Sequence, residues 1–237
     1  MTNSQKVIAQ LAAKFGTAVS GQYEAIRFQY YDYVRLPVGG TNRLTFFANP
    51  IGAVDPVSGL SKTLEETNVR RSGELDERFA IMQVRTSVSI LPMSRQPAGV
   101  STVTNAVVQG LTPIHQAISN LNFQGVLSVN FGQKNFIQIE QPLQMCPPGY
   151  GPSVRSISAS DIAAGAFPPV SQYTTQSVDP RDTYVMDPAI FVEKGQTFGA
   201  TIDYYTRNSA TIPQLGGANV AVNVGVIFDG YVIRPVQ

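Results

Sequence analysis

The chain has 237 residues, of which 43% are hydrophobic and only 14% are charged, and its net charge is +1. This length allows a sizeable core in one large domain or two small ones, and the weak net charge excludes a global field that would hold nucleic acid or an anionic membrane. The single cysteine, Cys146, excludes an intramolecular disulfide and a cysteine-rich metal site, and we interpret it as a small apolar filler.

The N-terminal stretch from Ser4 to Phe15 has apolar residues at helical spacing, and Ser4 and Gly16 suit the start and the end of a helix. We expect residues 1–20 to form a helical arm, which docks on a neighbouring subunit, lies on a membrane surface or packs on its own domain. The sequence has neither an apolar run long enough for a transmembrane helix nor a secretory signal pattern. We therefore expect the protein to fold in a cytoplasm.

Alternating or short apolar runs bounded by turn residues predict eight β-strands. They lie near residues 25–36, 43–48, 79–91, 125–131, 135–140, 188–193, 197–205 and 219–234. We predict one hairpin within Gly125–Glu140 and another within Pro188–Tyr205, whose turn contains Gly195 for a positive φ. Asp229-Gly230 predicts a turn or a bulge in the last segment. The strand total predicts a two-sheet sandwich, with residues 21–237 as one domain.

Three long connections interrupt these segments. Residues 49–75 predict a surface loop or a short helical excursion, in which nearby carboxylates largely neutralise Arg70 and Arg71. Residues 101–121 predict one or two short helices, and residues 142–187 predict a functional excursion or an interface-forming loop. Three aspartates in or next to the last connection lack the spacing of a known calcium loop, so we interpret them as turn and capping residues. They are Asp179, Asp182 and Asp187.

The usual sequence signatures of enzymes are missing. The nucleophile-elbow, P-loop, zinc-protease, CxxC and dinucleotide patterns do not occur. The one histidine, His115, has no second histidine to complete a zinc site, and we interpret it as structural. We therefore predict a protein that is not an enzyme, with no catalytic residues, no cofactor and no metal site.

Two stretches, PAIFVEKGQTFGATIDYY and NVAVNVGVIFDGYVIRPVQ, together with the strand order and the long loops, resemble the jelly-roll capsid proteins of tailless icosahedral bacteriophages. The resemblance implies an all-β jelly-roll sandwich with an N-terminal helix and long loops, and we prefer a single roll because the chain is short for two. It implies a virion structural protein, made in the host cytoplasm, that assembles an icosahedral shell through its loops and N-terminal arm.

The expected partners are copies of the same chain and other virion proteins, with contact to an internal membrane left open and no specific nucleic acid. The predicted subunit contacts on the helix are Val7, Ile8, Leu11 and Phe15.

The alternative function is a carbohydrate- or receptor-binding β-sandwich module, because tyrosines can stack on sugars or bases. Its candidate contacts are Tyr30, Tyr31, Tyr33, Tyr204 and Tyr205. Half-buried strand tyrosines are the competing interpretation. A third alternative is an enzyme of the cupin type, and the solitary histidine argues against the metal site of such an enzyme.

Overall fold

A computed structural model describes residues 3–15, 23–37, 40–90, 121, 124–132, 136–146, 152–153, 175–176, 184–204, 214–215, 218–219 and 222–235. The elements in chain order are α1 (Asn3–Phe15), β1 (Tyr23–Arg35), β2 (Arg43–Phe46), β3 (Arg78–Ile90), β4 (Val126–Phe131), β5 (Phe136–Pro142), a 3-10 turn (Leu143–Met145), β6 (Pro152–Ser153), β7 (Thr175–Gln176), β8 (Tyr184–Val192), β9 (Phe198–Asp203), β10 (Gln214–Leu215), β11 (Ala218–Asn219) and β12 (Val222–Pro235). The predicted helix and all eight predicted strands are present.

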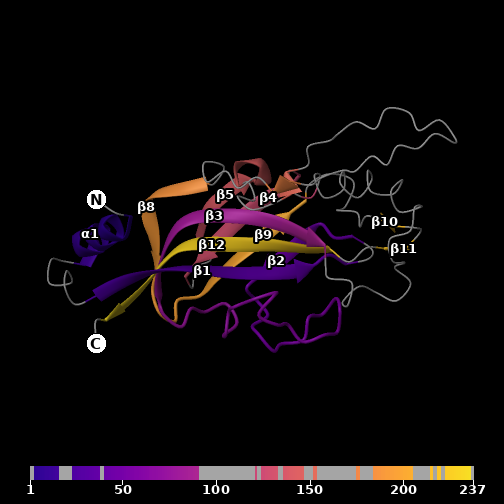
Figure 1. Cartoon of the computed structure of the whole chain (residues 1–237), viewed down its shortest axis with the longest axis horizontal. Helices are drawn as coiled ribbons and strands as arrows, with labels where there is room; N and C mark the ends of the chain where they lie inside the picture. The colour runs from indigo at the N-terminus through magenta and orange to yellow at the C-terminus, as the bar shows by residue number, and fades with distance from the viewer. Residues whose placement is uncertain are drawn as a thin grey trace.

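The main strands form two four-stranded antiparallel sheets that face each other (Figure 1). The first sheet has the order β1-β12-β3-β8 and the second has the order β2-β9-β4-β5. The predicted all-β sandwich is therefore confirmed, with one short helix beside it. The chain crosses between the two sheets from β1 to β2 and again from β2 to β3.

One predicted hairpin is confirmed and the other is wrong. β4 pairs with β5, as expected for the stretch Gly125–Glu140. β8 and β9 do not pair with each other: β8 pairs with β3, whereas β9 pairs with β2 and β4. The turn between them, where Gly195 has the predicted positive φ of 71°, carries the chain from one sheet to the other. A glycine turn between two apolar runs does not distinguish a hairpin from a turn that connects two sheets.

The core lies between the two sheets and is rich in phenylalanine. Phe47, which follows β2, stacks on Phe228 of the first sheet with ring centroids 4.9 Å apart, and it also lies 4.9 Å from Phe198 of the second sheet. Alternate residues of β12 point into this core from the first sheet, as the sequence pattern predicts. These residues are Val222, Val224, Val226 and Phe228, all buried. Cys146 is fully buried in the same cluster, which confirms its interpretation as an apolar filler.

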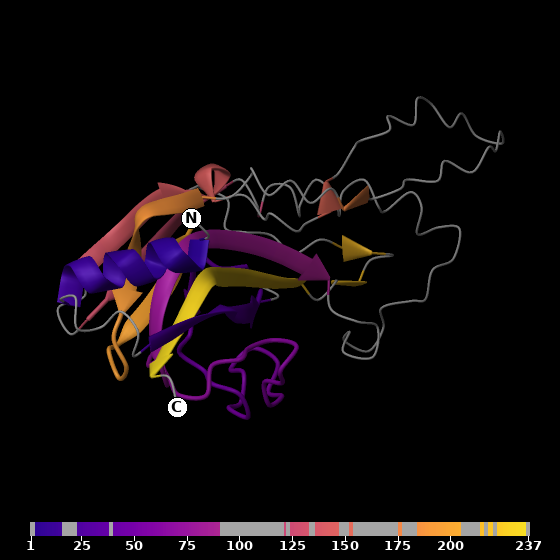
Figure 2. The same ribbon diagram turned by 60° about the vertical axis from the view of Figure 1, so that its left-hand side comes forward.

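α1 covers one end of the outer face of the first sheet, and a loop runs along the edge of this sheet at β1 (Figure 2). The loop, residues 47–77, contains no helix or regular strand, so the short helix that the sequence left open is not formed there. It protects the free edge of β1, where the Tyr33 amide donates to the Glu66 carbonyl oxygen at 2.6 Å and the Asn68 amide donates to the Tyr31 carbonyl oxygen at 3.3 Å. Covering an edge in this way blocks unwanted strand pairing.

Some predictions lie outside the described residues. They include almost all of the predicted helices of residues 101–121, with His115, and most of the predicted excursion of residues 142–187, with Asp179 and Asp182. No helix in the described ranges has the length and apolar character needed to cross a membrane.

Candidate interaction surfaces

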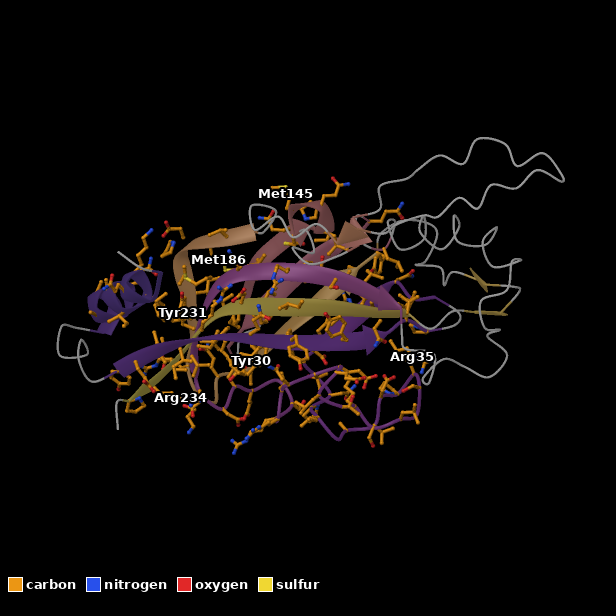
Figure 3. The ribbon with its side chains drawn as sticks, viewed as in Figure 1. Tyr30, Arg35, Met145, Met186, Tyr231 and Arg234 are labelled. Carbon is orange, nitrogen blue, oxygen red and sulfur yellow. The ribbon has the colours of Figure 1, made fainter. Side chains whose placement is uncertain are left out.

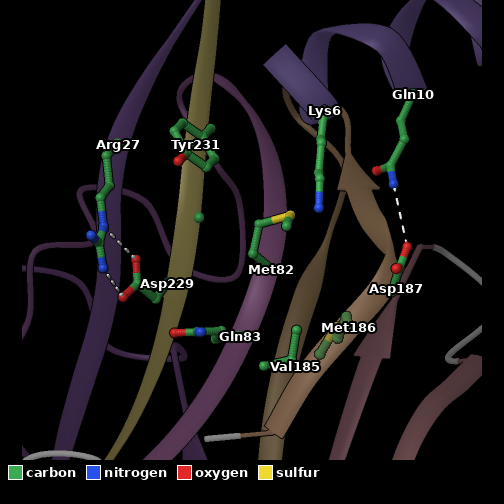
Figure 4. A pocket seen from close by; sticks show the side chains of 11 residues that line it. Lys6, Gln10, Arg27, Met82, Gln83, Val185, Met186, Asp187, Asp229 and Tyr231 are labelled. Carbon is green, nitrogen blue, oxygen red and sulfur yellow. Dashed lines mark hydrogen bonds and ion pairs between the residues drawn. The ribbon is translucent and has the colours of Figure 1, made fainter. Parts of the chain in front are cut away.

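A pocket of about 190 Å³ lies beneath α1, where three neighbouring strands of the first sheet are irregular at the same level (Figure 4). The pairing of β12 with β3 shifts at Asp229/Gly230, which confirms a bulge within one continuous strand. The pairing of β3 with β8 shifts between Ile81 and Gln83. Bulges bend a sheet and re-aim side chains. Their alignment across β12, β3 and β8 opens the space that α1 covers.

The Asp229 carboxylate, which lines this pocket, is bound by polar side chains of the neighbouring strands. The buried Asp229 carboxylate accepts hydrogen bonds from Arg27 and Gln29, each at 3.1 Å. Arg85, which is almost fully buried, places its Nη2 3.6 Å from the same carboxylate. The carboxylate is therefore compensated within the sheet. These contacts explain how a charge is tolerated on a largely covered sheet face.

Gln10 joins α1 to the irregular part of β8. Its amide nitrogen donates to Asp187 at 3.5 Å, and its amide oxygen accepts from the Ala189 backbone N–H at 3.3 Å. The Lys6 side chain extends from the same helix toward the pocket (Figure 4). Asp187 thus lies within β8 and contacts the helix, so its predicted role as a turn or capping residue is wrong.

The predicted subunit-contact residues of α1 are only partly available to a neighbour. Val7 is buried against Ala80 and Ile233 of the outer sheet face, so its side chain is engaged within its own domain. Ile8 is half-buried, and the side chains of Leu11 and Phe15 lie outside the described part of the structure. Contact between α1 and a neighbouring subunit stays a prediction, and Val7 serves as the anchor of the helix.

The tyrosines proposed for sugar binding do not form one surface. Tyr30 and Tyr204 are buried in the core, where they cannot contact a glycan. Tyr31 and Tyr33 are half-buried, with ring centroids 6.2 Å apart, and the Tyr31 hydroxyl donates to the Leu64 carbonyl oxygen. Tyr205 lies outside the described residues. Burial therefore excludes Tyr30 and Tyr204 from the five candidate glycan contacts.

The loop of residues 47–77 exposes five aliphatic side chains, which we call the aliphatic loop residues. They are Ile51, Val54, Val57, Leu60 and Leu64, and the most exposed among them are Leu64 at 63%, Val54 at 60% and Leu60 at 50%. An antiparallel bridge joins Val54 to Ser61, and the Asp55 amide donates to the Leu60 carbonyl oxygen at 2.9 Å. Val54 and Leu60 therefore lie close together on one turn of the loop.

The loop is held firmly although it lacks regular structure. Val69 and Leu75 are buried in the main core, and Ser72 donates to the Ala48 carbonyl oxygen at 2.6 Å. A buried ion pair joins Lys62 to Asp32 of β1 at 2.6 Å. The exposed aliphatic side chains are thus presented on a fixed backbone. Arg71 pairs with Asp76 on the loop surface at 3.4 Å, as the local mixture of charges predicts.

The spacing of aliphatic residues in the sequence of this loop is a signal for the exposed surface, although the loop is also rich in charged residues. Val54, Val57 and Leu60 recur every third residue among turn formers, where polar residues would satisfy the turns equally well. The prediction for residues 49–75 concerns Arg70 and Arg71 and does not include these aliphatic residues. Among the described residues, no group of three or more His, Cys, Asp or Glu side chains is arranged to hold a metal ion.

Comparisons with protein-family models, with curated proteins and with solved structures found no match to this chain.

Proposed function

We propose that the chain is a capsid subunit, a virion structural protein of which many copies assemble into an icosahedral shell. The proposal includes a single jelly roll. Numbered along the chain, the eight main strands pair first with eighth, second with seventh, third with sixth and fourth with fifth. A long antiparallel hairpin wound into two sheets has this nested order, and the pairing supports a jelly roll on that ground.

The observation that carries the capsid proposal is the exposure of the aliphatic loop residues on a firmly held loop. Jelly rolls serve capsids, lectins and cupins, so the fold alone does not choose between these functions. A sugar site stacks its ligand on aromatic rings, and none of the aliphatic loop residues offers a ring. Exposed apolar groups on a preorganised backbone favour contact with another protein, because little conformational entropy is lost on binding.

In this proposal the loop supplies the main contact between copies of the chain. The N-terminal helix contributes a second contact through Ile8, Leu11 and Phe15, while Val7 anchors the helix to its own sheet. Other virion proteins and an internal membrane are further proposed partners. The weak net charge of +1 favours protein contacts over binding to nucleic acid.

Sedimentation velocity of the full-length chain over a range of concentrations tests the proposal. We expect concentration-dependent oligomers for the wild type. Leu60→Asp, which would bury an unpaired carboxylate in the contact, should raise the concentration at which oligomers form by at least about tenfold. Met145→Asp is the matched control, because Met145 is 54% exposed but lies on the opposite side of the molecule from the loop (Figure 3).

Two outcomes would contradict this assignment. A wild-type chain that stays monomeric at every concentration lacks the contact altogether. Equal loss of association in Leu60→Asp and Met145→Asp would mean that the loop is not the contact surface. Binding of the monomer on a glycan array, abolished by substitution of Tyr31 or Tyr33, would favour the carbohydrate-binding alternative instead.

A further inference from the structure

A lysine and an aspartate meet in the interior of the domain. Asp32 occupies an inward-facing position of β1, between the core residues Tyr30 and Val34 in the strand alternation. Lys62 enters from the loop, and its Nζ lies 2.6 Å from Asp32 Oδ1. The side chains of Lys62 and Asp32 are only 2% and 1% exposed, respectively.

Burial disfavours the charged form of the Asp32 carboxyl group. Removing an ammonium and a carboxylate from water carries a penalty that their mutual attraction repays only in part. Transfer of one proton from Lys62 to Asp32 converts the ion pair into a neutral amine beside a neutral carboxylic acid. Burial raises the pKa of Asp32 above its ordinary value, although Lys62 acts in the opposite direction. A neutral lysine amine in a dry site is a nucleophile.

The second oxygen of Asp32 has a donor in place. The backbone N–H of Phe47 donates to Asp32 Oδ2 at 2.6 Å. Such a donor stabilises negative charge that develops on a carboxyl oxygen during nucleophilic attack. The nucleophile and the polarised carboxyl group are therefore held together by the fold, which removes the entropic cost of bringing them into contact.

From this arrangement we propose that Lys62 and Asp32 form an intramolecular isopeptide bond. The lone pair of Lys62 Nζ attacks Cγ of Asp32, and Oδ2 takes up negative charge beside the Phe47 N–H. The bond between Cγ and Oδ1 then breaks, and Oδ1 leaves as water with the carboxyl proton and one proton from nitrogen. One C–N bond forms, one C–O bond breaks and one water molecule is released, with no oxidant or reductant.

The bond would tie the loop to β1 covalently. Residues 32–62 would become a closed ring, so the aliphatic loop residues would keep their positions even when the sheet edge opens. The inference does not depend on the capsid proposal, because the bond forms within one chain whether or not the chain assembles.

Intact-mass spectrometry of the folded full-length protein, followed by tryptic mapping after denaturation, tests the inference. We expect the mass to be lower than the sequence mass by one water molecule. Trypsin should then release residues 28–35 joined to residues 44–70, uncleaved after Lys62. The Lys62→Arg variant, which keeps the positive charge but cannot form this bond, should have its full sequence mass.

The full sequence mass for the folded wild type, with cleavage after Lys62, would overturn the inference. Loss of water that maps to Asp229-Gly230, a sequence able to form a succinimide, would overturn it equally. The mass and the tryptic map of the wild-type chain decide the question, and circular dichroism checks that this chain is folded. A Lys62→Arg chain that fails to fold therefore does not affect the result, and Lys62→Met then supplies the unlinked control.

Discussion

Asp32 is the single residue on which the attachment of the loop to β1 depends most. Its carboxylate bonds Lys62 and the Phe47 backbone N–H, both at 2.6 Å. We predict that Asp32→Ala lowers the free energy of unfolding by at least about 3 kcal/mol, because it leaves a buried lysine without its partner, and by more where the proposed bond to Lys62 has formed. Chemical denaturation monitored by circular dichroism measures the change.

The exposed pair of Asp76 with Arg71 provides the matched control. Its side chains are 37% and 67% exposed, so Asp76→Ala should change stability by no more than about 1 kcal/mol. Similar losses in Asp32→Ala and Asp76→Ala would contradict the view that burial makes the first pair important.

Buried phenols make the fold sensitive to alkaline pH. Burial raises the pKa of Tyr204 above its ordinary value of 10.0 and raises the pKa of Tyr30 to about 12. The folded chain therefore holds these protons where the unfolded chain has lost them, so stability is complete below pH 10 and falls as the pH rises further.

Tyr204→Phe should flatten this fall, because the phenylalanine has no proton to lose. Above pH 10 each such tyrosine contributes up to about 1.4 kcal/mol of lost stability per pH unit. Urea denaturation at pH 8 and pH 11 compares the two proteins. An equal loss of stability in wild type and Tyr204→Phe would show that another group controls the alkaline response.

Among the elements, the bulge in β12 depends on a glycine. A Cβ atom at Gly230 would lie 1.9 Å from the carbonyl oxygen of Ala80 on β3, closer than any real contact. We predict that Gly230→Ala costs about 3 kcal/mol of stability, the upper end of the usual cost of overpacking. Thermal unfolding measures the loss.

Gly199 of β9 is the control for this substitution. A Cβ atom at Gly199 would meet no atom within 4 Å, and its φ is not in the left-handed region. Gly199→Ala should therefore change stability by less than about 1 kcal/mol. A Gly230→Ala protein as stable as Gly199→Ala would mean that the bulge relaxes without strain.

The local sequence pattern predicts where the helix and the strands of this protein lie better than it predicts which strands pair. The alternation in β3 and β12 and the helical spacing of α1 identify these elements because each reports which side is buried. Pairing is a property of distant segments, and the turn at Gly195 fits either a hairpin or a change of sheet. The inward position of Asp32 follows from the alternation of β1, but its partner Lys62 lies in a loop without periodicity.

The candidate surface on the loop could not be predicted from the sequence, because it depends on contacts across the whole fold. Exposure of Val54, Leu60 and Leu64 depends on how residues 47–77 are fastened to the sandwich, which involves Asp32, the core and the edge of β1. The same aliphatic residues would be core residues in a loop folded inward. Val7 shows the converse, because this one residue of the predicted subunit contact is buried against its own sheet.

We propose that copies of this chain assemble into a shell. Electron microscopy of the purified full-length protein, concentrated under conditions where the wild type sediments as oligomers, tests it most directly. We predict closed particles or curved sheets of uniform subunits for the wild type and for Met145→Asp, and dispersed single molecules for Leu60→Asp. Fields of dispersed monomers for the wild type at every concentration would contradict the claim.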